Sequence, residues 1–179
     1  MKKVFKTISL LFTVALLSSC LKSNDLIGPN AANSAGAIIE FDNIDFIASG
    51  SSSATVFLAR YDETITPKTA TSKLVLRVNY AGTGKPAPSD VTVNLTTDAA
   101  ALTLHNTQAG KSFTAIPAAW FTLPASVVIP AGQNVVEVPV TINMTNFVAG
   151  STYALAFKIA SASSGTISGN FGTIVVSVK

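Results

Sequence analysis

Apolar residues occupy every second position in five short runs: Leu74 to Tyr80, Val91 to Leu95, Val136 to Ile142, Tyr153 to Ile159 and Ile174 to Val178. A period of two places alternate side chains on opposite faces of a β-strand, so each run has one face to bury. Glycine, proline, asparagine and serine separate the runs, as is typical of an all-β domain. The pattern therefore predicts half-buried, antiparallel strands.

Shorter runs complete the count of about eight strands: Ile38 to Phe46, Thr55 to Arg60 and Val127 to Ile129. Two antiparallel sheets packed face to face would bury all of these faces, which predicts a β-sandwich of about seven to nine strands. Pro139 interrupts a strand and lacks an N–H, so it indicates an edge strand or a bulge. Only the segment from Asp98 to Gln108 favours a helical turn or two.

The N-terminus has the organisation of a cleaved signal peptide. Three lysines precede a predominantly apolar segment of ten residues, Ile8 to Leu17, and the small-residue site Leu17-Ser18-Ser19-Cys20 follows. An apolar segment of ten residues is too short for a transmembrane helix, which needs about twenty. The tetrapeptide resembles the lipobox of bacterial lipoproteins, which implies cleavage before Cys20, lipid on its sulfur and durable attachment to a membrane.

The sequence accordingly predicts three parts: a signal peptide over residues 1–19, a flexible tether over residues 20–36 and one β-sandwich domain over residues 37–179. The tether is rich in Asn, Ser, Ala and Gly. Cys20 is the only cysteine, so no disulfide can brace the domain. Its hydrophobic core must therefore suffice for stability.

The basic character of the precursor belongs to its signal peptide. Lys2, Lys3 and Lys6 are removed with that segment, so the number of basic residues falls from 12 to that of the acidic residues, which is 9. A near-neutral domain with only two arginines, Arg60 and Arg77, has no field that concentrates phosphates. We therefore expect no nucleic-acid partner.

Few residues suit catalysis or metal binding. His105 is the only histidine, which leaves no histidine-rich zinc site, and we expect it to be a solvated loop residue. A glycosidase would need two carboxylates, for which Glu137 and Asp98 are the available candidates, but Glu137 alternates with buried valines. We expect no catalytic residue and no cofactor.

Two short motifs have simpler explanations. Asp42-Asn43-Ile44-Asp45 offers oxygen atoms to calcium, although a bent strand or an Asx-turn explains it equally. Gly82-Thr83-Gly84-Lys85 superficially resembles a phosphate loop, but Asn79 and Pro86 occupy positions where that motif requires glycine and Ser or Thr. We expect a hairpin turn there, and no metal site in the chain.

Trp120 is the main candidate for ligand binding, with Tyr80 and Tyr61 as weaker ones. Trp120 and Phe121 are neighbours on a segment bounded by prolines, so one ring can be buried and the other exposed. An exposed Trp120 would provide a stacking platform for a sugar ring. The alternative is that Trp120 fills the sandwich core.

Several segments occur in an order that resembles a known family. They are Ser89 to Asn94, Ile116 to Leu123, the turn Ile129-Pro130-Ala131-Gly132-Gln133, Val135 to Ile142, Tyr153 to Ser163 and Ile167 to Val178. Together with the lipobox, they resemble a Bacteroidota lipoprotein domain of unknown function, found at the N-terminus of surface endo-β-N-acetylglucosaminidases and related glycan-utilisation proteins. The resemblance covers roughly Ile38 to Lys179 and implies an immunoglobulin-like sandwich.

The resemblance implies a bacterial envelope location but no activity. A (β/α)₈ barrel needs about 250 residues, so the glycosidase domain of such relatives has no counterpart in this chain. Leu21-Lys22-Ser23-Asn24-Asp25 partly resembles the signal that exports these lipoproteins, so we expect lipid anchoring to the outer membrane at the cell surface. The periplasmic face is the alternative.

Three functions remain in view at this stage. The first is a non-catalytic lipoprotein that binds glycans or supports a surface glycan-utilisation complex together with envelope proteins. The second is a structural or adhesive surface subunit that acts through protein–protein contacts, since Val- and Thr-rich strands can pair edge to edge. The third, a stand-alone hydrolase, is based only on the family neighbours.

The first prediction concerns the anchor. Replacing the lipidated residue, Cys20→Ala, should release the protein from the membrane fraction and leave the sandwich folded, because the lipid is chemically separate from the core. Cell fractionation with circular dichroism of the released protein measures both effects. A variant that stays in the membrane fraction contradicts the lipobox interpretation.

Overall fold

The computed structural model describes residues 36–43, 46–47, 59–63, 71–82, 84–148 and 151–178. The signal peptide, Cys20 and all of the tether except Gly36 lie outside the described residues. Most of the strand predicted from Thr55 to Arg60 also lies outside them, and its last two residues begin a strand that continues to Glu63.

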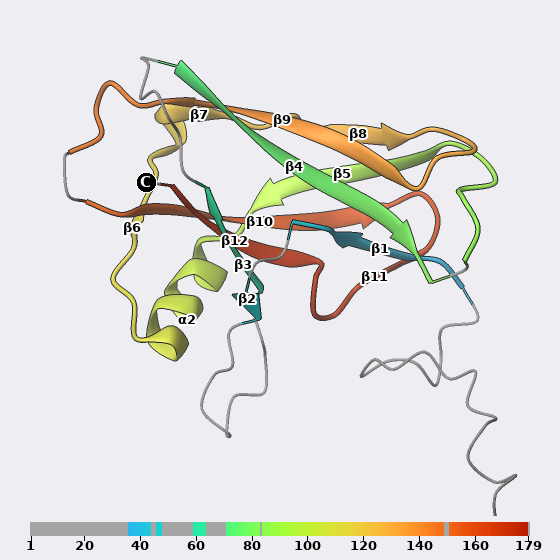
Figure 1. Cartoon of the computed structure of the whole chain (residues 1–179), viewed down its shortest axis with the longest axis horizontal. Helices are drawn as coiled ribbons and strands as arrows, with labels where there is room; N and C mark the ends of the chain where they lie inside the picture. The colour runs from blue at the N-terminus through green and yellow to red at the C-terminus, as the bar shows by residue number, and fades with distance from the viewer. Residues whose placement is uncertain are drawn as a thin grey trace, which may run out of the picture. The chain divides into compact units, whose positions relative to one another are not determined.

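The described part contains two β-sheets, which lie as two layers (Figure 1). Sheet A has five strands in the order β11-β1-β4-β9-β7, and sheet B has seven, in the order β2-β3-β12-β10-β5-β8 with β6 beside β10. The strands of sheet A are β1 Ile38–Phe41, β4 Thr71–Ala81, β7 Phe121–Thr122, β9 Val135–Asn143 and β11 Thr166–Ile167. Those of sheet B are β2 Phe46–Ile47, β3 Ala59–Glu63, β5 Val91–Thr97, β6 Thr114–Ala115, β8 Ser126–Ile129, β10 Tyr153–Ala162 and β12 Thr173–Val178.

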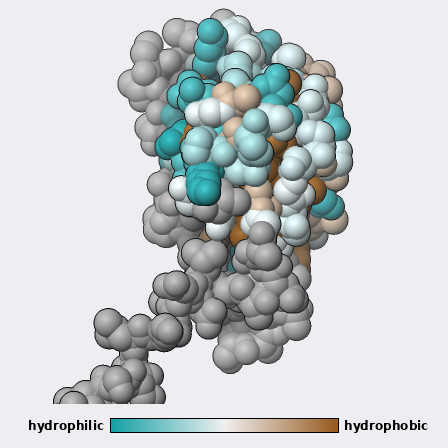
Figure 2. Space-filling model, turned by 90° about the vertical axis from the view of Figure 1, so that its right-hand side faces the viewer, coloured by the Kyte–Doolittle hydropathy of each residue, from teal (hydrophilic) through white to brown (hydrophobic). Residues whose placement is uncertain are grey.

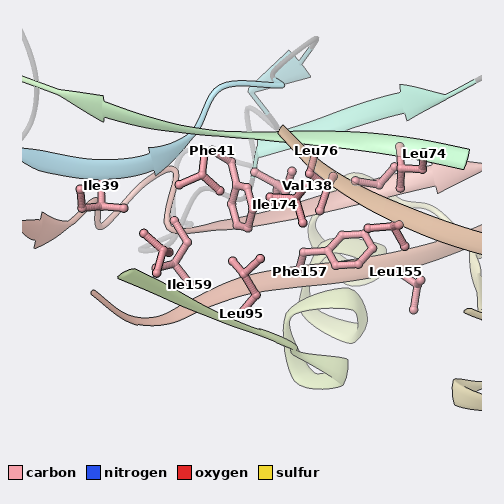
Figure 3. Packing of buried hydrophobic residues seen from close by; sticks show 14 of the residues in the cluster. Ile39, Phe41, Leu74, Leu76, Leu95, Val138, Leu155, Phe157, Ile159 and Ile174 are labelled. Atoms are coloured by element: carbon pink, nitrogen blue, oxygen red, sulfur yellow. The ribbon is translucent and has the colours of Figure 1, made fainter. Parts of the chain in front are cut away.

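The predicted alternation is confirmed in the core between the sheets. On β4 every second residue from Ser72 to Tyr80 is buried, and β5 repeats the pattern from Val91 to Leu95. Side chains of the two sheets meet in one cluster, in which Leu76 and Val138 of sheet A lie near Phe157 and Ile174 of sheet B (Figure 3). The all-β sandwich expected from the sequence is therefore the observed fold.

Three strand pairings depart from the antiparallel expectation. β1 pairs with β11, β3 with β12 and β6 with β10 in parallel. The described strands also outnumber the prediction, because β2, β6, β7 and β11 have only two residues each, too short to leave a periodic pattern. The segment Gly82 to Lys85 is not a hairpin turn, since it connects β4 in sheet A to β5 in sheet B.

Helix α2, Ala99–Ala109, confirms the helical segment predicted from Asp98 to Gln108. An Asp98 Oδ1 accepts a hydrogen bond from the Ala101 N–H at 3.0 Å, and Gly110 closes the helix in the left-handed conformation. The helix packs on the outer face of sheet B, so β10 and β12 are largely buried on both faces. The expectation of one-sided sheets is wrong there, because α2 takes the place of solvent.

Pro139 occupies an edge, as predicted. β9 pairs with β4 along nine residues, but β7 pairs only with Thr141 and Ile142 on its other side. Pro139 is exposed and has a paired strand on one side alone, where its missing N–H is tolerated. Within the part of the chain that the structure describes, no helix has the length and apolar character needed to cross a membrane.

The second prediction concerns the core. Phe157 is 1% exposed at the centre of the cluster, so Phe157→Ala should lower the free energy of unfolding by about 3–5 kcal/mol. Val128→Ala, at a position 43% exposed on β8, is the control and should change it by less than about 0.5 kcal/mol. Urea unfolding followed by circular dichroism measures both. Equal effects of the two substitutions would contradict this assignment of the core.

Candidate functional site

An aromatic cluster lies at the end of the sandwich where β10 begins. It consists of Trp120, Phe147 and Tyr153. The ring centroids of Trp120 lie 5.8 Å from Phe147 and 6.0 Å from Tyr153, and those of Phe147 and Tyr153 are 4.2 Å apart. All three pairs are tilted, a favourable geometry for aromatic contacts.

The chain holds Trp120 from both sides. Pro117 precedes a single 3₁₀ turn, η2 Ala118–Trp120, in which the Trp120 N–H donates to the Pro117 carbonyl at 2.9 Å. Directly after it, Phe121 in β7 pairs with Ile142 of β9. Upstream, the Ile116 N–H donates to the Ala154 carbonyl at 3.1 Å. The indole is thus fixed between an anchor on sheet B and one on sheet A.

Phe147 is positioned by the turn that follows β9. The Asn143 Oδ1 accepts the Thr145 N–H at 3.0 Å, which is an Asx-turn, and the Phe147 N–H donates to the Met144 carbonyl at 3.0 Å. The next residue is tied to the cluster, because the Val148 N–H donates to the Tyr153 Oη at 3.2 Å. These bonds fix the second ring beside the indole.

The cluster is partly open to solvent. Tyr153 is only 5% exposed, whereas Trp120 and Phe147 are partly buried and Val148 beside them is 64% exposed. Trp120 therefore combines the two alternatives derived from the sequence: it packs against the core and also keeps some accessible surface. A supported ring with an accessible part is suited to stacking on a sugar ring.

The segments that build the cluster carry no charge. Between Lys111 and Lys158 the only charged residue is Glu137, which pairs with Arg77 of β4. Glu137 precedes Ile142 by five residues, which places it roughly 17 Å from Ile142 along β9. On the described strands of sheet B, the charged residue at the cluster end is Glu63, which lies two strands from Tyr153. The Glu63 Oε2 accepts a hydrogen bond from the Tyr61 hydroxyl at 2.6 Å. On sheet A, Lys73 pairs with Thr141 and is exposed on the solvent face of β4. The aromatic surface itself is therefore uncharged.

The other two aromatic candidates lie elsewhere. Tyr80 is 6% exposed and pairs with Ile39, roughly 25–30 Å along β4 from the strand end that pairs with Asn143. It belongs to the core and has almost no ring face for a ligand. Tyr61 is partly buried on β3 and packs against the core. Its hydroxyl donates to Glu63 at the cluster end of sheet B, but β12 lies between β3 and β10, and the ring contacts of the cluster are among Trp120, Phe147 and Tyr153. The structure thus separates Tyr80 from Trp120 and leaves Tyr61 outside the cluster.

Sequence reasoning missed Phe147 as a site residue and placed Tyr153 only in a core stripe. Phe147 falls between two strands, where no periodicity distinguishes it. The available signal was the Asn143 and Asn146 pair around it, since asparagine favours tight turns that present the intervening side chains in a fixed direction.

The residues considered for catalysis have structural roles. Asp98 caps α2 and also forms an ion pair with Lys158 at 3.5 Å, while Glu137 is exposed on sheet A. His105 is not a solvated loop residue but is fully buried on α2, because the helix presses it against sheet B. The Ser177 Oγ donates to Asp62 at 2.5 Å rather than to His105, so these residues form no catalytic triad.

The calcium candidate is explained by local bonding. An Asp42 Oδ2 lies 2.9 Å from an Arg77 Nη, and the Asn43 Nδ2 donates to the Val75 carbonyl at 3.1 Å. Both side chains thus brace β4, while Ile44 and Asp45 lie outside the described residues. Within the described ranges no group of three potential metal-ligating side chains occurs.

Shifted pKa values occur away from the aromatic cluster. Burial raises the pKa of the Glu40 carboxyl, against the opposing effect of a hydrogen bond to Ser168. Burial lowers the pKa of the His105 imidazole. Neither group lies among the cluster residues.

The far end of the sandwich has a different surface. The loops that connect β4 to β5 and β8 to β9 lie there, opposite the start of β10 (Figure 1). Figure 2 shows this end, where the coloured surface is mostly hydrophilic or weakly hydrophobic. It presents no broad apolar patch in that view.

Comparison with protein families found a match over residues 40–166, more than half of the chain, to a family described as a "-like, N-terminal domain". Comparison with curated proteins found no match. The family resemblance expected from the sequence is therefore confirmed.

Several solved structures have a similar fold. A candidate carbohydrate-binding protein from Bacteroides ovatus is 12% identical with a TM-score of 0.61, and the match covers 79% of this chain and 36% of that one. A multidomain Bacteroides ovatus protein that includes DUF1735 is 18% identical, with a TM-score of 0.57 and coverages of 78% and 44%. EndoBT-3987 from Bacteroides thetaiotamicron, solved with a Man5GlcNAc product, is 18% identical, with a TM-score of 0.56 and coverages of 67% and 28%.

These identities support a shared fold and no more. The chain spans less than half the length of each of these three proteins. Their descriptions refer to whole proteins, most of whose length lies outside this match.

The third prediction concerns the aromatic cluster. Trp120 is the only tryptophan, so its fluorescence reports on this end alone. Phe147→Ala should shift the emission to longer wavelength, because removing the neighbouring ring admits water to the indole. Val148→Ala, one residue along and largely exposed, is the matched control and should leave the emission unchanged. An unshifted Phe147→Ala spectrum would show that the ring does not shield the indole.

Proposed function

Because this chain belongs to a family of N-terminal domains, as the match over residues 40–166 shows, we propose that it is a non-catalytic lipoprotein domain that binds neutral glycans. The observation that carries the proposal is the partly exposed Trp120, held by Phe147 and Tyr153 on segments without charge. The chain acts by binding and catalyses no reaction.

The chemistry of the cluster favours a sugar ring over other ligands. The C–H face of a hexose is weakly apolar and stacks on an aromatic face, while its hydroxyls need neutral hydrogen-bonding groups at the rim. The backbone and side chains around Thr145, Ser151 and Thr152 can supply such groups. The charge nearest in register on sheet A is Lys73, which pairs with Thr141 and lies on the solvent face of β4. On sheet B, Glu63 is already bonded, so the aromatic rings themselves offer acidic sugars no ion pair.

The similar structures support the same direction. One is described as a candidate carbohydrate-binding protein, and another was solved with an oligosaccharide product. Each of these descriptions concerns the other protein, and they motivate the choice of glycans as the ligands to test.

We propose lipid anchoring through Cys20 to the outer membrane, with the sandwich at the cell surface. The lipobox and the partial export signal after it support this location. Protease treatment of intact cells tests it: digestion of the sandwich without lysis is the expected result. Full protection would place the domain on the periplasmic face.

The fourth prediction tests binding. The full chain should bind neutral oligosaccharides on a glycan array, and Trp120→Ala should weaken binding about tenfold or more in calorimetry, since an aromatic anchor carries much of the energy of such a site. Trp120→Phe should retain part of the affinity, and the matched surface control Val128→Ala should retain all of it. A folded protein that binds no glycan, or a Trp120→Ala variant that binds normally, would overturn the proposal.

A structural or adhesive role is the second candidate. It is favoured by β8, which forms one edge of sheet B and exposes Val128. An open edge can accept a strand from another chain. Light scattering discriminates the two functions, because an adhesive subunit should associate through this edge whereas a glycan-binding domain can act as a monomer.

A further inference from the structure

Helix α2 covers an apolar patch on the outer face of sheet B. Ala101 and Leu102 of the helix pack against Ala154, Ala156 and Val175. Phe113 packs against the same patch and is tied to the helix by two hydrogen bonds with the Asn106 side chain, at 3.0 and 3.2 Å. Helix α2 and Phe113 therefore form one cover, which we call the α2 cover.

His105 lies beneath the α2 cover. Its exposure is 0%, and neither its Nδ1 nor its Nε2 has a hydrogen-bond partner among the described residues. The imidazole stacks on Phe113, with ring centroids 6.0 Å apart and planes 9° from parallel. A buried imidazole without acceptors is accommodated as the neutral form, because a charged ring would lose its hydration without gaining a hydrogen bond.

Charged groups reach this site from two neighbouring segments. On β3, the Arg60 guanidinium lies 5.9 Å from the Phe113 ring centroid. Its charge disfavours a positive charge on the His105 imidazole. Asp62 on the same strand favours protonation, but Arg60 and the Ser177 hydroxyl already bond to its carboxylate. Lys111, directly after the helix, also disfavours the charged imidazole.

The remaining charges on the described elements around His105 are those of Glu63, Asp98 and Lys158. Asp98, at the start of the helix, pairs with Lys158 on β10 at 3.5 Å, and the Glu63 Oε2 at the end of β3 accepts the Tyr61 hydroxyl at 2.6 Å. From β12, Ser177 contributes only a neutral hydroxyl. The protein surroundings of His105 therefore provide no carboxylate dedicated to the protonated ring.

We propose that the α2 cover is released by acid: when the His105 imidazole takes up a proton, the cover leaves sheet B and exposes the apolar patch, while the sandwich stays folded.

Hydrogen bonds to β10 confine the release to this segment. Before the helix, the Asp98 N–H donates to the Ala156 carbonyl at 2.9 Å. After it, the Thr114 N–H donates to the Thr152 carbonyl at 3.0 Å, and the Ile116 N–H to the Ala154 carbonyl at 3.1 Å. The cover is thus anchored at both ends on one core strand, and the aromatic cluster beyond Ile116 keeps its position.

The direction of the pH effect follows from the two states of the imidazole. In the docked cover, burial first and then the Arg60 charge lower the pKa of His105 from 6.5, whereas in the released cover the ring is hydrated and its pKa is ordinary. Docking is therefore fully present above about pH 6.5 and weakens as the pH falls toward the lowered pKa. Each unit between the two pKa values changes the release equilibrium tenfold.

The fifth prediction tests this release on the full chain carrying Cys20→Ala. His105 is the only histidine, so its NMR signal is unique, and it should titrate below 6.5. Hydrogen-exchange protection of α2, corrected for intrinsic rates, should fall from about pH 7.5 to about pH 5, by a factor set by how far the pKa of His105 is lowered. Protection of β10 and β12 and the fluorescence of Trp120 should not change.

Two variants provide the controls. His105→Phe keeps an aromatic ring without a titrating group and should abolish the pH dependence; His105→Leu serves the same purpose if the larger ring prevents folding. Adding Thr107→His to His105→Phe restores a histidine at an exposed position of the same helix and should not restore the effect. Any of three results would overturn the proposal. The protection of α2 in the wild type could be independent of pH, the same pH dependence could remain without His105, or β10 could lose protection together with α2.

Discussion

The antiparallel pairing of β4 with β9 is the interaction on which the rest of the structure depends. Nine residue pairs, from Thr71 with Asn143 to Asn79 with Val135, fix the register of the two longest strands of sheet A. A slip of one residue would turn Leu74 and Leu76 to solvent and bring Lys73 and Arg77 into the core. The same register positions Ile142, with which β7 pairs, and so determines where Trp120 lies.

Much of this fold could be predicted because its core strands alternate without interruption. Periodicity was enough to predict the buried faces of β4, β5, β9, β10 and β12. A capping residue, Asp98, was enough to predict the start of the helix. The parallel pairing of β3 with β12 could not be predicted, because periodicity assigns a buried face but no pairing partner. His105 was misplaced for a related reason: the two leucines of the helix, Leu102 and Leu104, lie on different sides of it, so the sequence does not indicate which side faces the sheet.

The candidate site was predicted in part. Trp120 was identified from its residue type and its proline-bounded segment, but its two neighbours come from loops and strand ends far along the chain. Phe147 and Tyr153 meet Trp120 only because β7 and β6 bring residues 114–122 across one end of the sandwich, from sheet B to sheet A. The site is therefore a property of strand connections, and the similar folds at low identity carry no information about whether it is shared.

The segment from Asp98 to Thr114 is hydrogen-bonded at both of its ends to the first part of β10 or the residue directly before it. Its two backbone anchors, at Ala156 on β10 and at Thr152 directly before that strand, lie four residues apart. Chain closure between such neighbouring points depends only weakly on the length of the excursion. Chain closure therefore sets little limit on the length of this segment, so a foreign peptide can be grafted here as long as the insertion leaves Ala154, Ala156 and Val175 covered.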